Sequence, residues 1–108
     1  MTRVTYDMQK LGEAVSIMAL GSGPLKARLR DTIIPLLTLR TSGIHNKKRV
    51  GELDSICERL MGGALDDLSE NEALELARHI VQLESSNWHD VVWELEDQLR
   101  ERSQEGPR

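Results

Sequence analysis

Apolar residues recur every three or four positions along most of the chain, which is the spacing of helices that bury one face. Near the N-terminus such a face holds Met8, Leu11, Val15 and Met18. Similar stripes return after each break in the pattern. The pattern predicts five helices, over residues 5–20, 24–42, 46–61, 69–84 and 88–102.

The most apolar stretch of the chain, residues 31–39, lies in the second predicted helix. Ile33 and Leu36 continue one apolar stripe from the start of the helix, but Ile34, Leu37 and Leu39 fall on other faces. Because a helix that is apolar nearly all round is buried by its neighbours, we expect this helix, about 24–42, to lie at the centre of a bundle. Pro35 lies inside it and removes one backbone hydrogen bond, which predicts a kink. A proline in mid-strand argues against the alternative of a central strand.

Glycine, serine and asparagine mark the predicted helix ends. Gly43 is expected to end the second helix, and Asn46 to cap the third. The strongest local signal is the run Ser69-Glu70-Asn71-Glu72. It matches a capping box, in which the first and fourth residues each bond the other's backbone N–H. The run Ser-Ser-Asn at residues 85–87 predicts a tight connection, so that the fourth and fifth helices form an antiparallel pair.

The fifth predicted helix carries an apolar stripe that we expect to face the core. The stripe consists of Trp88, Val91, Val92, Leu95 and Leu99. We find no sustained heptad repeat, which argues against a long coiled coil. The predicted fold is therefore all-α, a compact bundle of four to five amphipathic helices around a central Pro-kinked helix.

Length and composition fit a single domain with an aliphatic core. The chain has 108 residues, of which 39% are hydrophobic, and it contains no Phe. We predict one helical domain over residues 1–102 and a disordered polar tail over residues 103–108. A single cysteine, Cys57, excludes an intrachain disulfide. The N-terminus lacks a signal-peptide apolar region, and no apolar run approaches the ~18–20 residues that span a bilayer, so we expect a cytoplasmic protein without a membrane partner.

Charge is distributed unevenly between the two halves of the chain. Residues 1–50 hold nine Lys and Arg against three acids, a net charge of +6, and residues 51–108 hold five against fifteen, a net charge of −10. Such asymmetry indicates either partners of opposite charge at two ends of the molecule or self-contact. The alternative is that the two halves neutralise each other within the fold.

The basic half contains a cluster that could meet phosphates. The residues that carry this hypothesis are Lys47, Lys48 and Arg49, with Arg28 and Arg30 in the second helix. The cluster lacks the interleaved aromatic residues of a single-strand platform, and the sequence pI of about 5.3 is unlike that of a simple DNA-binding domain. Nucleic-acid association is therefore the alternative function, and a solvated basic loop is the simpler explanation.

Trp93 is the residue that most suggests a binding role. It lies well off the apolar stripe of the fifth helix and shares its side with His89, Glu96 and Arg100. An aromatic residue among charged residues is a typical anchor for a protein partner. The competing explanation is that Trp93 fills a second packing seam within the same chain.

No motif for catalysis, a cofactor or a metal is present. The sequence offers no HExxH, no Cys/His cluster and no Gly-rich phosphate loop. We therefore expect no cofactor, no metal, no small-molecule substrate and no enzymatic activity. The sequence favours a small non-enzymatic interaction module, a regulator or inhibitor that docks a helix face onto a protein partner, and that partner could be a second copy of the chain.

Overall fold

The computed structural model describes residues 3–104, with side chains for residues 5–102. Within that range the chain forms four α-helices, one 3-10 turn and no strand. The helices are α1 (Arg3–Leu20), α2 (Leu25–Ser42), α3 (Val50–Leu60) and α4 (Glu70–Gln104), and the 3-10 turn η1 is Lys47–Arg49. The all-α prediction is confirmed.

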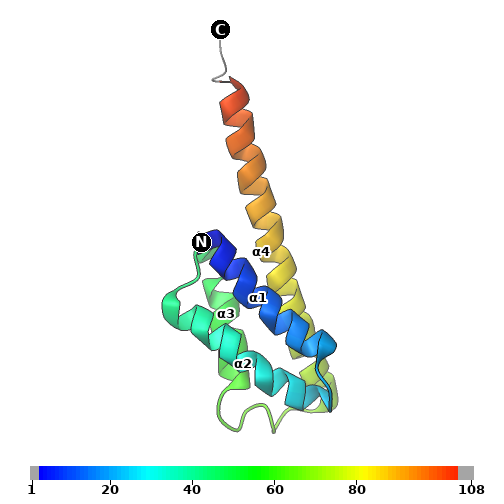
Figure 1. Ribbon diagram of the computed structural model, residues 1–108. Helices are drawn as coiled ribbons and strands as arrows, with labels where there is room; N and C mark the ends of the chain where they lie inside the picture. Colours follow the sequence, from blue (N-terminus) through cyan, green and yellow to red (C-terminus); the bar gives the residue numbers. More distant parts are fainter. Residues whose placement is uncertain (1–2, 105–108) are drawn as a thin grey trace.

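Helices α1, α2, α3 and the first half of α4 form a bundle around one aliphatic core (Figure 1). Helix α1 packs on α2 and α4, and α3 packs on α2 and α4. Every helix contributes buried residues, and two connections add one leucine or isoleucine each. The fully or almost fully buried apolar residues are Leu11, Ala14, Met18, Leu29, Leu36, Leu39, Ile44, Leu53, Ile56, Cys57, Leu60, Leu65, Ala73, Leu76, Ile80 and Leu83.

Helix α2 lies against all three other helices, as expected for the central element. It begins after Pro24, continues through the buried Pro35 and ends at Gly43, whose φ of 89° suits glycine. The expectation that it is buried all round is wrong, because Ile34 is 71% exposed and Leu37 36% exposed. Three neighbours leave one side of α2 open, since part of α4 does not join the bundle.

Two predicted caps have their expected partners. The Ser69 N–H donates to Glu72 Oε1 at 3.0 Å, and the Glu72 N–H donates to Ser69 Oγ at 3.1 Å, which confirms the capping box. The hydrogen bonds from Ser69 hold the pKa of the Glu72 carboxyl below its ordinary value. Asn46 caps the 3-10 turn η1 by accepting from the Lys48 N–H. Helix α3 therefore begins later than predicted, and the three basic residues precede it.

The predicted break at residues 85–87 is wrong. The fourth and fifth predicted helices are one continuous helix, α4, of 35 residues. The Ser-Ser-Asn run contains no glycine or proline, and the side chain of Asn87 is buried and bonded to Asn46 instead of capping a new helix. The expected antiparallel pair of helices within one chain therefore does not form.

At 1.5 Å per residue, α4 is about 52 Å long, much longer than its neighbours. Its proximal half, residues 70–87, packs on the bundle, and its distal half, residues 88–104, projects beyond it (Figure 1). The helix continues through Gln104, two residues into the predicted polar tail, and residues 105–108 of that tail lie outside the described residues. In the part of the chain that the structure describes, no helix combines the length and hydropathy needed to cross a bilayer.

Candidate protein-docking surface on helix α4

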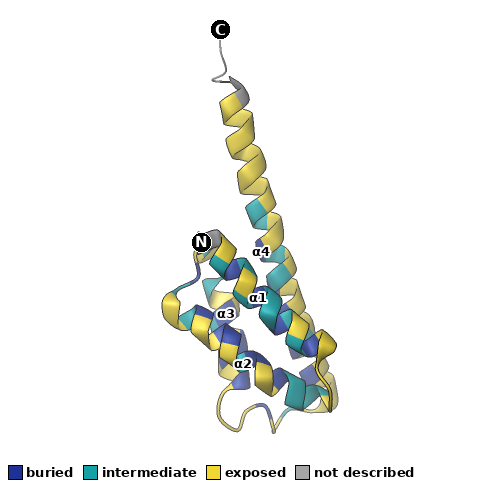
Figure 2. Cartoon of the chain, in the orientation of Figure 1, coloured by how far each residue is buried: buried dark blue, intermediate teal, exposed yellow. Residues whose placement is uncertain are grey.

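The apolar stripe of the distal half of α4 faces water and not the core. Trp88 is 53% exposed, Leu95 53% and Leu99 62%, and Val92 is 36% exposed. Figure 2 shows the distal half almost wholly exposed, in contrast to the proximal half. The prediction that these residues face inward is therefore wrong, because it assumed a turn that would fold the fifth helix back onto the fourth. Only Val91, at the edge of the stripe, is half-buried.

The distal stripe, defined as Trp88, Val92, Leu95 and Leu99, is a single face of the helix. Its members are spaced by four, three and four residues, which places them in one row. Full burial of such a side chain is worth roughly 1.5–3 kcal/mol, so about half of that is still available at each position. Such a row of exposed apolar side chains is a candidate interaction surface.

The core face of α4 behaves differently along the same helix. On the proximal half it carries Ala73, Leu76, Ile80 and Leu83, all buried. Continued at the same spacing beyond residue 84, this face becomes polar, with Asn87, Asp90, Glu94, Asp97 and Glu101. The core face therefore stops being apolar where the bundle ends, whereas the distal stripe begins there. The stripe is not an extension of the core.

The four residues predicted from the sequence as a partner-binding set lie together on a third face of the distal half. Trp93 is 63% exposed, and His89, Glu96 and Arg100 are exposed as well. The explanation that Trp93 is buried in a second seam within the chain is not what the structure shows. The structure thus brings this set together beside the distal stripe, and its role in binding stays a prediction.

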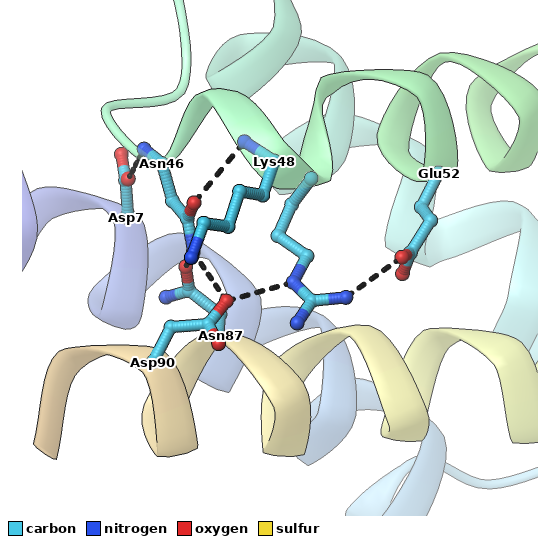
Figure 3. Close-up of polar contacts among 7 residues, drawn as sticks. Asp7, Asn46, Lys48, Glu52, Asn87 and Asp90 are labelled. Atoms are coloured by element: carbon cyan, nitrogen blue, oxygen red, sulfur yellow. Dashed lines mark hydrogen bonds and ion pairs between the residues drawn. The ribbon is translucent and has the colours of Figure 1, made fainter. Parts of the chain in front are cut away.

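A polar junction holds α4 at the point where it leaves the bundle (Figure 3). The Asn46 side chain donates to Asn87 Oδ1 at 3.1 Å and to Asp90 Oδ2 at 2.8 Å. Arg49 Nε donates to the same Asp90 oxygen at 2.9 Å. The backbone N–H of His45 donates to the buried Asp7 of α1 at 2.8 Å. The junction ties α1, the 44–49 connection and α4 together, and so fixes the direction in which the distal half projects.

Electrostatic interactions at this junction favour the charged forms of Asp90 and Arg49. Hydrogen bonding from Arg49, and then from Asn46, holds the pKa of the Asp90 carboxyl below its ordinary value. The same contacts with Asp90 and Glu52 raise the pKa of the Arg49 guanidinium. Arg49 is therefore committed to the fold, with Glu52 Oε1 2.8 Å from its Nη1.

The residues predicted for nucleic-acid contact do not form one basic surface. Arg28 donates to the Met18 carbonyl at 2.7 Å, and Arg30 pairs with Asp66. Lys47 and Lys48 are exposed, but they line a cavity of about 390 Å³ whose opposite wall includes acidic residues of α4. Those acidic residues are Asp90, Glu94 and Asp97. Acids so close to the lysines oppose a phosphate ligand.

Several arginines of the basic N-terminal half pair with acids of the C-terminal half. Besides the pairs of Arg30 and Arg49, Arg40 lies 3.1 Å from Asp54 and 3.9 Å from Glu58. This fits the alternative in which the two halves neutralise each other inside the fold. The acids of the distal half beyond Asp90 take no part in these pairs among the described side chains.

Other reactive groups are held within the bundle. Cys57 is buried, and burial raises the pKa of its thiol, so it lacks the character of a nucleophile. Among the side chains of residues 5–102, no three His, Cys, Asp or Glu residues gather in a way that could hold a metal ion. No family model, curated protein or solved structure matches the chain.

The exposure of the distal stripe was not predicted from the sequence, for one reason. The stripe itself was recognised, but the break assigned to residues 85–87 turned it toward the core. The signal that would have corrected this is the composition of residues 85–87, which contain no glycine or proline to end a helix.

Proposed function

We propose that this protein is a small non-enzymatic interaction module that docks a face of the distal half of α4 onto a protein partner. The observation that carries this proposal is the exposed distal stripe on a helix that has left its own bundle. Large apolar side chains in a row, bordered by charged residues, are typical of helix-in-groove and helix–helix recognition. A role as regulator or inhibitor of a larger assembly fits the small size and the absence of recognisable catalytic motifs.

The distal half carries apolar, mixed and acidic residues on separate faces, which supports docking by one face. The distal stripe would supply most of the apolar contact, and Trp93, with His89, Glu96 and Arg100, would border it as a polar rim with one aromatic anchor. The acids of the core face beyond Asp90 point elsewhere and would stay in water. The bundle would serve as a rigid base, because the junction at Asn87 and Asp90 fixes where the helix points.

Affinity capture from the native host with matched variants tests the proposal. The wild-type chain and a Leu95→Glu variant are compared with Ile34→Glu, which makes the same change at an exposed site of α2, far from the distal stripe. A captured protein is then purified, and its dissociation constant is measured with all three chains. We expect Leu95→Glu to weaken binding at least tenfold and Ile34→Glu to leave it unchanged. Binding that is insensitive to the distal stripe, in every captured species including the chain itself, would falsify the proposal.

A further inference from the structure

We infer that the partner of the distal stripe is a second copy of this chain, with the two α4 helices packed antiparallel along their whole length. This inference rests on the proposed function and names its partner. It is carried by three features of α4: an apolar row longer than the distal half, a groove that continues it, and a charge order that distinguishes the two directions of packing.

The apolar row does not begin at Trp88. On the proximal half, Leu74 is 43% exposed and Val81 44% exposed, although the core lies directly beside them. Leu74, Val81, Trp88 and Leu95 recur every seven residues. The alternate position of the same heptad is apolar only on the distal half, at Val92 and Leu99, and on the proximal half it holds Arg78 and Ser85. We call the six apolar residues the long stripe. Because α4 is continuous, they lie on one face over about 38 Å.

A groove beside the proximal half continues the long stripe onto α1. It has a volume of about 410 Å³ and lies between α1 and α4. Its apolar walls come from Val15, Met18 and Ala19 on one side and from Leu74, Ala77 and Val81 on the other. A helix placed on Leu74 and Val81 would therefore also touch α1. The distal half, with no helix beside it, has the shape and apolar face to occupy that position on a second copy.

The order of charges along α4 selects the antiparallel direction. In each half, acids precede a base beside the long stripe: Glu72 and Glu75 precede Arg78, and Glu96 precedes Arg102. In a parallel pair, Arg78 would face Arg78 of the second copy within the seam, and Arg102 would face Arg102. Like charges in those places disfavour the parallel direction.

An antiparallel pair centred between Ser86 and Asn87 gives four residues of the long stripe apolar partners, and it places Leu95 against the aliphatic stem of Arg78 and Trp88 against Ser85. In this register Leu74 faces Leu99 of the second copy, and Val81 faces Val92. Arg78 lies beside Glu96 of the second copy. The two-fold axis makes each of these contacts twice. Glu75 also comes close to Glu96 of the second copy, but Arg78 lies one turn from Glu75 and offsets that repulsion.

The same register also gives Arg102 acidic neighbours on the second copy. It lies level with Asn71 of the second copy, between Glu70 and Glu72, in the first turn of the partner helix. The distal end of each α4 therefore carries its basic residues to the acidic start of the other.

Interface size favours pairing along the whole helix over contact between the distal halves alone. The distal stripe spans about 17 Å, less than half of the ~38 Å of the long stripe. With a helix about 10 Å wide, the two contacts cover footprints of roughly 170 and 380 Å² on each copy. Stable interfaces bury about 800 Å² per partner. The longer contact covers more than twice the area of the shorter one, and the walls of the groove add to it, so it comes nearer to that size.

Sedimentation equilibrium of the full chain over a range of concentrations tests the dimer. We expect a reversible two-chain species, and we expect Leu99→Glu, at a position that faces Leu74 of the second copy, to raise its dissociation constant at least tenfold. Ile34→Glu, the same change on an exposed face of α2, should leave the constant unchanged. Circular dichroism of both variants checks that the helices persist. A wild-type chain that stays monomeric up to millimolar concentration, or a dimer that tolerates Leu99→Glu, overturns the inference.

Two further variants test the direction of packing. Arg78→Glu and Glu96→Arg should each weaken the dimer, and the double variant should restore it, because the antiparallel register places these residues beside each other. In a Cys57→Ser background, Ser85→Cys near the two-fold axis should form an intermolecular disulfide, whereas Leu99→Cys should not. A disulfide through Leu99→Cys alone would indicate parallel helices and overturn this register.

The inference and the proposed function fail in different ways. If the chain is monomeric but binds another protein through the distal stripe, the function stands and the second copy is not the partner. If no binding of any kind depends on the stripe, both are wrong.

Discussion

The two halves of α4 belong to one helix and differ in what surrounds them. In the proximal half, one face is buried to completion, as at Leu76 and Ile80, which are 0% exposed. In the distal half, every residue from Val92 to Arg102 is exposed. The apolar content does not fall between the halves as sharply as the burial does. The difference teaches that amphipathicity identifies a face that needs a partner, and does not say whether the partner lies in the same chain.

The core face explains why the bundle stops covering α4 at Asn87. From that residue onward, the positions that would face the bundle are polar, and the first of them, Asn87 and Asp90, are used in the junction with Asn46 and Arg49. The junction replaces apolar packing by hydrogen bonds at the edge of the core. The distal half therefore leaves the bundle because the face that it turns toward the bundle is polar.

The largest contrast between the halves should appear when one leucine is truncated in each. Leu76→Ala empties a fully buried site and should lower the free energy of unfolding by about 2–5 kcal/mol. Leu99→Ala, 62% exposed, should change it by less than about 0.5 kcal/mol when the chain is monomeric. Urea unfolding at low protein concentration measures both. Equal losses at the two sites would mean that the distal half is packed within its own chain.

Weakening the polar junction between the halves should lower the free energy of unfolding by an intermediate amount. Asp90→Asn removes the charge that Arg49 and Asn46 contact, while it keeps the shape of the side chain. We expect a loss of about 1 kcal/mol in the free energy of unfolding. This is less than the ~1.5–3 kcal/mol typical of a hydrogen bond to a charged group, because both charged side chains are partly open to solvent, at 22% exposed. Glu94→Gln, which makes the equivalent change one turn further along the helix, is the matched control. A loss as large in the control would assign the effect to net charge and not to the junction.

The same variant predicts a dependence on pH. The pKa of the Asp90 carboxyl is lowered in the folded protein, so its stabilising effect is fully present above the pKa of the unfolded chain, about 4. That effect is lost as the pH falls through the lower folded pKa. The stability difference between wild type and Asp90→Asn should therefore be constant from pH 7 to about 5 and shrink below pH 4. A difference that grows with acidification would contradict the assigned sign.

A smaller effect separates a true helix start from a predicted one. Ser69→Ala removes the cap at the beginning of α4 and should cost about 1 kcal/mol. Ser85→Ala changes the same residue type at the exposed site where the sequence had suggested a second start. There we expect a gain of up to about 0.5 kcal/mol, because alanine is the better helix former inside a helix. Destabilisation by Ser85→Ala would mean that residues 85–87 do form a break.

Sequence reasoning succeeded where the determinant was local. The capping box needs only Ser69 and Glu72, three residues apart, and the end of α2 needs only a glycine at residue 43. It failed at residues 85–87, because serine and asparagine are compatible with both a cap and a helix interior. A distant residue, Asn46, favours the helix interior here, because its side chain donates a hydrogen bond to Asn87 Oδ1. For the same reason, the local pattern identifies the distal stripe as one face of a helix but cannot predict what that face contacts.

The smallest effects concern the two tryptophans, which distinguish the faces of the distal half without disturbing the fold. Trp93→Phe leaves Trp88 as the single reporter of the long stripe, and Trp88→Phe leaves Trp93 as the reporter of the neighbouring face; each should change stability by less than about 0.5 kcal/mol. In dilute solution both should be quenched readily by acrylamide, since the two rings are 53% and 63% exposed. At concentrations that favour the antiparallel dimer, quenching of Trp88 should fall severalfold, because Trp88 lies in the seam opposite Ser85 of the second copy, and quenching of Trp93 should change little. Weak quenching of Trp93 in dilute solution would mean that it is buried within its own chain. If dimerisation lowered the quenching of Trp93 but not of Trp88, the interface would lie on the other face of the helix.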